Sequence, residues 1–491
     1  MEGLKEKTAH SLFWSVLNNG TTQLLNIAFG IILGRLLSPA DYGLVGVLTI
    51  FTLIAGNLQS SGFSQGLINL KSPTPTDYNS VFWFNVTVSI ILYIILFFSA
   101  PLIASFFNDE RLVDLSRFIF LGFVISSLGI AHAAYMNKNM MNKEVAVCNL
   151  MALVISGAVG VYLAFNGFSY WSLAWQQIVF ITVLNIGRYL SVNWHPTFSF
   201  ALEPIKRMFS FSVKILFTNI LNTLSTNVLT FIFGRLFPKT DVGNYTRANE
   251  WNNRSHSFVS GTMAQVAQTV LVSANDEVER EKRVFRKMTR FTALLSFPLM
   301  FGLAIVANEF IVITLTEKWN GAILLLQILC LGGAFLPFYT LFQHLTISSG
   351  RSDIYLKTNL IQIVLQVLFI LLFHKQGIVV MVIVYSVFNV LWLLMWQRIA
   401  YKLINLKLRE TLLDIIPFML GAALTMAAVY FVTLPIKSLV LLFVSRVILG
   451  ALLYFVVMKL ANAKILDECL AFMKQKFKKG DSSKTGSDLE S

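Results

Sequence analysis

Runs of about 20 apolar residues recur along the whole chain, and they constrain its fold more than any other feature. Each run is long enough to cross a hydrocarbon core of roughly 30 Å as a helix. The 491 residues are 56% hydrophobic and only 13% charged, whereas about a quarter of an ordinary soluble protein is charged. A transmembrane β-barrel is excluded, because its strands would be about ten residues long with alternating polarity. The sequence therefore predicts an all-α polytopic membrane protein.

Fourteen membrane spans fit the apolar runs and the turn residues between them. Their predicted bounds are 11–33, 44–68, 80–104, 117–136, 145–165, 168–188, 211–233, 245–271, 289–307, 322–347, 355–373, 377–397, 412–432 and 438–458. If both termini are cytoplasmic, most of the 39 lysines and arginines lie in cytoplasmic segments, as the positive-inside rule requires. The net charge of +14 is therefore explained by orientation in the membrane and by attraction to anionic lipid headgroups, and it does not indicate binding of nucleic acid.

One short segment occurs twice: residues 34–43 read GRLLSPADYG and residues 234–243 read GRLFPKTDVG. Similar turns after membrane helices would explain the glycines, but not an arginine and an aspartate at matching places. We therefore predict an internal duplication of a six-helix unit. The predicted divisions are an N-terminal six-helix lobe at 1–204, a C-terminal six-helix lobe at 205–405, two additional transmembrane helices at 406–460 and a cytoplasmic tail at 461–491.

Polar side chains are concentrated in the first, second, seventh and eighth spans, which are equivalent pairs in the two repeats. Polar groups inside a membrane are costly and usually face a bundle interior or a watery cavity. We therefore expect the two pairs to line a central cavity. Outside the eighth span, the candidate cavity residues are Gln23, Asn26, Asn57, Asn219 and Asn222.

The eighth span holds three charged candidates, Arg247, Glu250 and Arg254, whose spacing places them on one helical face. One interpretation is a salt-bridged face at the outer membrane interface. The functional interpretation is a cationic patch for an anionic ligand, in which Glu250 holds the arginines in place. Arginine suits phosphate because its planar donors engage two oxygens at once and it stays charged.

The duplicated segment contributes four further candidates, Arg35, Arg235, Asp41 and Asp241. They either form part of a gate or anchor the ends of the helices. We favour anchoring for the two arginines. The chain has no phosphate-binding glycine loop and no His-Glu-x-x-His motif, and its cysteines lack metal-ligand spacing. We accordingly predict no catalytic residue, no metal site and no cofactor.

Several motifs together resemble one family of transporters. They are Phe13-Trp14-Ser15, the segment 34–43, Glu317-Lys318-Trp319 before the tenth span, and the segment 349–353 after it. Up to about residue 460, the chain resembles the Wzx-type polysaccharide transporters, including colanic-acid-like exporters. These belong to the multidrug/oligosaccharidyl-lipid/polysaccharide exporter superfamily.

The resemblance implies two facing six-helix lobes with two extra helices, working by alternating access. It implies a bacterial inner-membrane flippase that moves polyprenyl-diphosphate-linked oligosaccharides for O-antigen, capsule or exopolysaccharide biosynthesis. Membrane lipids are expected partners, and a polysaccharide polymerase and chain-length machinery are further candidates. Coupling to an H⁺ or Na⁺ gradient is left open.

Three other functions are weighed against this one. A cation-coupled drug antiporter of the related multidrug branch would favour acidic cavity residues, whereas the eighth span is net positive. A membrane polymerase or ligase usually needs a large external loop, and the longest external connection predicted here is short, at 105–116. A scaffold protein would not require arginines inside a span. We therefore predict a transporter and not an enzyme.

Overall fold

The computed structural model of the protein describes residues 2–60, 62–272, 277–468 and 471. Every regular element in these residues is helical, which confirms the predicted all-α class. The chain divides into two compact units, Met1–Thr246 and Arg247–Ser491, and the division falls inside one long helix, α10. The boundaries predicted at 204/205 and 405/406 divide the chain by its duplicated six-helix unit and not by compactness, and they stay a prediction.

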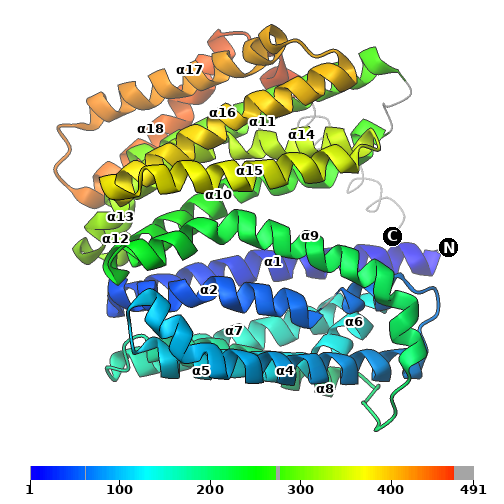
Figure 1. Ribbon diagram of the computed structural model, residues 1–491. Coiled ribbons are helices and arrows are strands. Elements are labelled where there is room, and N and C mark those ends of the chain that lie inside the picture. The colour runs from blue at the N-terminus through cyan, green and yellow to red at the C-terminus, as the bar shows by residue number, and fades with distance from the viewer. Residues whose placement is uncertain (1, 61, 273–276, 469–470, 472–491) are drawn as a thin grey trace, which may run out of the picture. The chain divides into compact units, whose positions relative to one another are not determined.

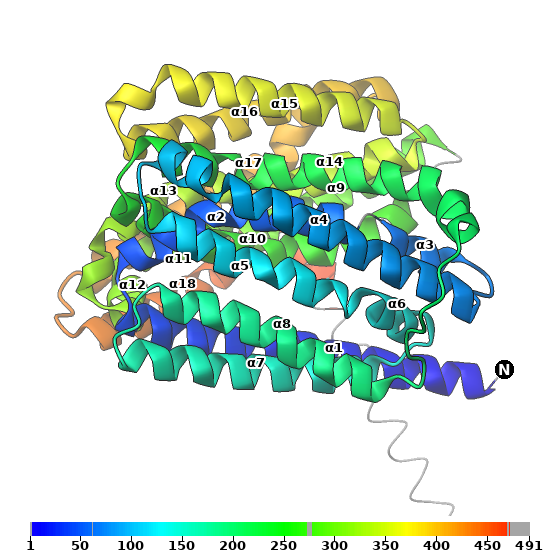
Figure 2. The same cartoon turned by 60° about the horizontal axis from the view of Figure 1, so that its bottom comes forward.

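The N-terminal unit consists of nine helices and the first part of a tenth (Figure 1). Their bounds are α1 (Glu2–Leu36), α2 (Pro39–Ser60), α3 (Phe63–Asn69), α4 (Pro75–Phe107), α5 (Leu112–Ser127), α6 (Ile130–Lys138), α7 (Asn142–Phe165), α8 (Trp171–Ser191), α9 (Leu202–Leu236) and α10 (Lys239–Val272). Within this unit α1, α7 and α8 lie side by side (Figure 2), and α2 packs against α9.

The C-terminal unit contains the rest of α10 and the helices that follow it. Their bounds are α11 (Val278–Ile305), α12 (Ala307–Leu315), η1 (Glu317–Trp319), α13 (Asn320–Gly333), α14 (Leu336–Ser348), α15 (Ser352–Leu372), η2 (His374–Gln376), α16 (Ile378–Ile404), α17 (Leu408–Thr433) and α18 (Leu439–Leu460). In this unit α11 packs against α17 and α18, and α13 and α14 pack against α16.

Each of the fourteen predicted spans coincides with one helix or with two consecutive helices. In the part of the chain that the structure describes, 9 helices are long and apolar enough to cross a membrane. The number is 10 if α5 and α6, which are bent by 44°, form one span. The helices α1, α8, α9 and α10 are not among them, so the count of fourteen stays a prediction. The protein is nevertheless a multi-pass membrane protein.

The two copies of the repeated segment contact each other within the N-terminal unit. A Cβ atom on Gly43 would lie 1.8 Å from the carbonyl oxygen of Lys239, and one on Gly243 would lie 1.7 Å from that of Pro39. Pro39 and Lys239 are themselves equivalent positions of the repeat. Such a reciprocal contact, in which each copy presents the same surface to the other, is typical of two similar units around a twofold axis. It supports the predicted duplication and explains why both positions are glycine.

Candidate functional site

The three charged residues on α10 form one ion-paired group, as their spacing predicts. The two oxygens of Glu250 accept separate hydrogen bonds, one from Arg247 Nη1 at 2.5 Å and one from Arg254 Nη2 at 2.7 Å. The side chain of Arg247 is only 4% exposed, whereas those of Arg254 and Glu250 are 28% and 35% exposed. Arg247 is therefore a buried support, and Arg254 is the arginine that a ligand could reach.

Aromatic rings hold both guanidinium groups of this triad. The Cζ atom of Arg247 lies 5.9 Å from the ring centre of the fully buried Trp319, and that of Arg254 lies 5.8 Å from the ring centre of Trp251. Trp251 in turn meets Phe310 of α12 edge to face, with 4.7 Å between ring centres. A cation over an aromatic face is stabilised electrostatically. Trp319, singled out in the sequence only by family resemblance, therefore packs beside the triad.

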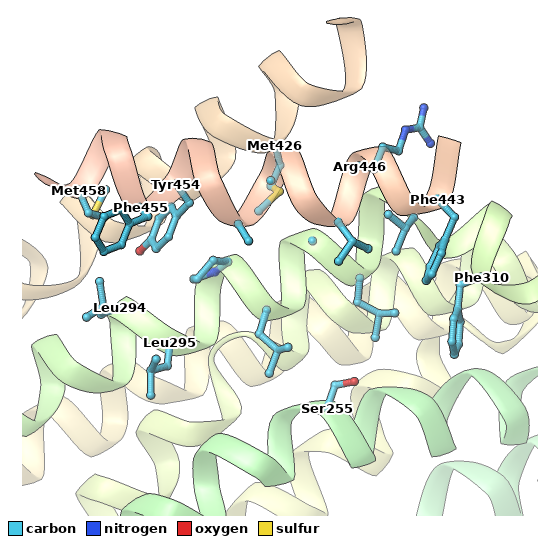
Figure 3. A pocket seen from close by; sticks show the side chains of 18 of the residues that line it. Ser255, Leu294, Leu295, Phe310, Met426, Phe443, Arg446, Tyr454, Phe455 and Met458 are labelled. Carbon is cyan, nitrogen blue, oxygen red and sulfur yellow. The ribbon is translucent and has the colours of Figure 1, made fainter. Parts of the chain in front are cut away.

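An apolar cavity of about 590 Å³ is lined in part by the residue that follows Arg254 (Figure 3). Ser255 of α10 lines it together with side chains from α11, α12, α17 and α18. Among them are Leu295, Phe310, Met426 and Tyr454. On α10 a partly exposed arginine is thus followed directly by a serine that lines an apolar cavity, a combination suited to an amphiphile with an anionic head.

A further arginine within a predicted span, Arg446 of α18, lies at the edge of this cavity but is directed away from it (Figure 3). It forms a buried ion pair with Glu309 of α12 at 2.9 Å. Its guanidinium also donates to the Thr433 hydroxyl and to the Ile305 carbonyl, both at 3.1 Å. Arg446 is therefore a structural group. Sequence reasoning missed the pair, although an arginine inside an apolar span signals that some partner exists.

The polar candidates of the N-terminal unit fall in two separate places. Gln23 and Asn26 of α1 line a polar cavity formed with α7 and α8. Asn57 of α2 instead donates to the Thr223 hydroxyl at 2.7 Å and to the Asn219 carbonyl at 3.4 Å, and so joins α2 to α9. Asn222 also lies on α9, but its side chain is outside the described part of the structure. That all these residues line one cavity stays a prediction.

The four candidates of the repeated segment lie at helix ends. Arg35 and Arg235 are exposed in the last turns of α1 and α9. Asp41 accepts hydrogen bonds from the backbone and hydroxyl of Ser38, at 2.8 and 2.6 Å, and so caps the start of α2. Asp241 occupies the equivalent place in the first turn of α10. These positions favour anchoring over a direct role in transport.

Comparison with known proteins agrees with the family that the motifs indicate. A sequence model described as polysaccharide biosynthesis protein matches residues 32–324. The lipopolysaccharide biosynthesis protein WzxC of Escherichia coli K12 is 24% identical over 72% of this chain and 73% of its own. The teichuronic acid biosynthesis protein TuaB of Bacillus subtilis 168 is also 24% identical, over 70% of this chain and 71% of its own.

Two solved structures share the fold. The lipid II flippase MurJ in an inward closed conformation gives a TM-score of 0.72 at 13% identity, covering 93% of this chain and 100% of its own. An inward-facing MATE multidrug transporter gives 0.61 at 15% identity, covering 78% and 95%. The match of the family model extends over more than half of the sequence, so this chain belongs to the polysaccharide biosynthesis protein family.

Proposed function

We propose that the protein is a flippase for a polyprenyl-diphosphate-linked oligosaccharide. It would move this cargo from the cytoplasmic to the outer leaflet of the bacterial inner membrane, for the biosynthesis of a surface polysaccharide. Membership of the polysaccharide biosynthesis family supports the proposal. The names of relatives support it as well, among them the succinoglycan biosynthesis transport protein ExoT of Rhizobium meliloti, 25% identical over 68% of this chain and 67% of its own.

The strongest structural support is the adjacency of Arg254 and Ser255 on α10. Arg254 keeps part of its guanidinium exposed, which suits a diphosphate because arginine engages two oxygens at once. Ser255 belongs to the wall of the apolar cavity, which suits a polyprenyl chain. A lipid-linked diphosphate needs both environments within a short distance, and a small cationic drug does not need the first.

Glu250 and Arg247 would support Arg254 in this role. Glu250 bonds both arginines, so it neutralises the buried charge of Arg247 and restrains Arg254 when no cargo is present. The group keeps one net positive charge, which an arriving diphosphate would meet. We assign these residues to binding and to no covalent step, in keeping with transport by alternating access.

The remaining features of the proposal come from the sequence. We place both termini in the cytoplasm on the distribution of lysine and arginine. An H⁺ or Na⁺ gradient is the candidate driving force. A polysaccharide polymerase and its chain-length machinery are candidate partners, alongside membrane lipids and the lipid-linked oligosaccharide itself.

Transport by Arg254→Ala tests the proposal. Purified protein is placed in liposomes with a fluorescent polyprenyl-diphosphate oligosaccharide, and its arrival in the opposite leaflet is followed with and without an H⁺ or Na⁺ gradient. A hydrogen-bonded charged contact is worth about 1.5–3 kcal/mol, so we expect about 10- to 100-fold slower transport at limiting cargo. Arg254→Lys should fall between the wild type and alanine, because lysine keeps the charge but not the planar donors.

Arg280→Ala is the matched control, since it removes one exposed cation at the start of α11, on a different helix from the triad. It should transport at the wild-type rate. Equal rates for Arg254→Ala and the wild type would contradict the role of Arg254. Absence of cargo movement with the wild-type protein, together with export of cationic dyes, would instead favour the drug antiporter.

A further inference from the structure

The N-terminal unit contains a cavity of about 490 Å³ that is lined mainly by side-chain amides. The cavity lies among α1, α7 and α8, and its volume is within the range of about 300–1,000 Å³ that is typical of small-molecule sites. Seven amide residues from the three helices line it: Asn18, Asn19, Gln23, Asn26, Asn149, Gln176 and Gln177.

Two glycines of α7 allow the three helices to approach closely around this cavity. A Cβ atom on Gly157 would lie 2.5 Å from the ring of Phe29 of α1, and one on Gly160 would lie 3.1 Å from the Cβ of Gln176 of α8. The amide side chains are thus brought together by tight packing on either side of α7. Their convergence is a property of the tertiary structure, because α1 is far away in sequence from the neighbouring helices α7 and α8.

Amides elsewhere in the same unit serve as helix-to-helix contacts. Asn57 bonds the hydroxyl of Thr223, and Asn185 of α8 donates to the carbonyl of Ile125. Amides also line the cavity, and among them Asn19 and Gln177 are exposed. Polar side chains inside a membrane protein are costly, and such groups face the interior of a bundle or a watery cavity.

The chemistry of the lining indicates an uncharged, hydroxyl-rich ligand. Each amide offers both donors and acceptors, which matches hydroxyl groups that also do both. Among the lining residues that the structure describes none is charged, so the lining provides no countercharge for a diphosphate or a cation. Leu153, Phe180 and Ile181 complete the lining with apolar surface, which suits the C–H faces of a sugar ring.

We propose that this amide-lined cavity binds one uncharged sugar unit of the transported oligosaccharide. The proposal rests on the proposed function, and it separates recognition of the sugar from recognition of the diphosphate at Arg254. Sugar selectivity would then reside in the N-terminal unit, at Asn149, Gln176 and Gln177, and the charged triad on α10 would be indifferent to the sugar.

Saturation-transfer NMR on the full-length protein in detergent tests the site directly. The probes are the methyl glycosides of glucose, galactose and N-acetylglucosamine, and the variants are Asn149→Leu and Gln177→Leu. Loss of one neutral hydrogen bond costs about 1 kcal/mol, so we expect at least one glycoside to bind the wild type and to bind each variant roughly 5- to 10-fold more weakly. Thr182→Val is the control, because Thr182 lies on α8 and bonds its own helix at the Ile178 carbonyl.

The same variants in the liposome assay separate this inference from the proposed function. We expect a raised KM for the lipid-linked oligosaccharide with little change in the maximal rate, and a wild-type KM for Thr182→Val. If both cavity variants bind the glycosides as the wild type does and transport the lipid-linked oligosaccharide with the wild-type KM, the sugar site is overturned. The proposed flippase function would be unaffected by that result. A different outcome is that the wild type binds a glycoside and the cavity variants do not, but the protein transports no lipid-linked sugar. This result would support the sugar-binding site and overturn the flippase function. Failure of all three glycosides to bind the wild type would overturn the site.

Discussion

At the scale of single residues, the intramembrane arginines have two different environments. Arg254 is partly exposed on α10, whereas Arg446 is 5% exposed and paired with a carboxylate that is 4% exposed. Burying two charges away from water costs a large desolvation free energy. The attraction between the charges offsets this cost only when their geometry is good and other hydrogen bonds are made. Burial and hydrogen bonding therefore distinguish a structural arginine from one that is available to a ligand.

The pair of Arg446 and Glu309 should consequently be sensitive to single substitutions. Glu309→Gln leaves the arginine charge buried without a countercharge, which costs about 3–5 kcal/mol in comparable pairs. We expect a clearly lower melting temperature in detergent. The double variant Glu309→Leu/Arg446→Met should recover most of the loss, because it removes both charges. A double variant as unstable as Glu309→Gln would show that the charge imbalance is not the cause.

The connection between α4 and α5 contains a further pair, in which Arg111 donates to both oxygens of Asp109 at 2.9 and 2.8 Å. This hydrogen bonding lowers the pKa of Asp109 below its ordinary value. A carboxylate with a lowered pKa contributes stability at higher pH and loses it as the pH falls through its folded value. The melting temperature of the wild type should thus be higher than that of Asp109→Asn near neutrality, and the difference between the two should shrink under acidic conditions. A difference independent of pH would contradict this assignment.

At the scale of helices, the starts of α2 and α10 cross at Gly43 and Gly243. Neither position has room for a Cβ atom, because a backbone carbonyl of the opposite copy occupies that space. Gly43→Ala should therefore force the two helices apart, and overpacking of this kind costs about 1–3 kcal/mol or more. The measurement is thermal unfolding in detergent.

Gly56 of the same helix provides the control, since a Cβ atom there would meet nothing within 4 Å. Gly56→Ala should be neutral or stabilising by up to about 1 kcal/mol, because alanine is the better helix former. Equal stability of the two alanine variants would contradict a tight crossing at Gly43.

At the scale of the whole molecule, the predicted orientation can be tested at two connections. With both termini cytoplasmic, the connection after the fifth predicted span is external and the one after the eighth is internal. Asn166→Cys, in a protein whose native cysteines are replaced, should react with an impermeant maleimide in intact cells. Glu279→Cys should react only after the cells are opened, and the reverse pattern would contradict the orientation.

The sequence by itself determined the helical class, the family and the positions of the helices. Apolarity over about 20 residues is a local property, so each predicted span coincides with helix in the structure. The triad of α10 was equally predictable, because Arg247, Glu250 and Arg254 are neighbours on one helix. The repeated segment was recognisable as well, although its role in the crossing was not.

The tertiary structure alone decided which helical faces meet. It pairs Arg446 with Glu309, which lies on another helix far away in sequence, and it places Gln23 and Asn26 beside the amides of α7 and α8. It joins Asn57 to α9 instead. The physical reason is that side-chain polarity reveals that a group needs a partner, whereas the identity of the partner depends on packing between distant helices.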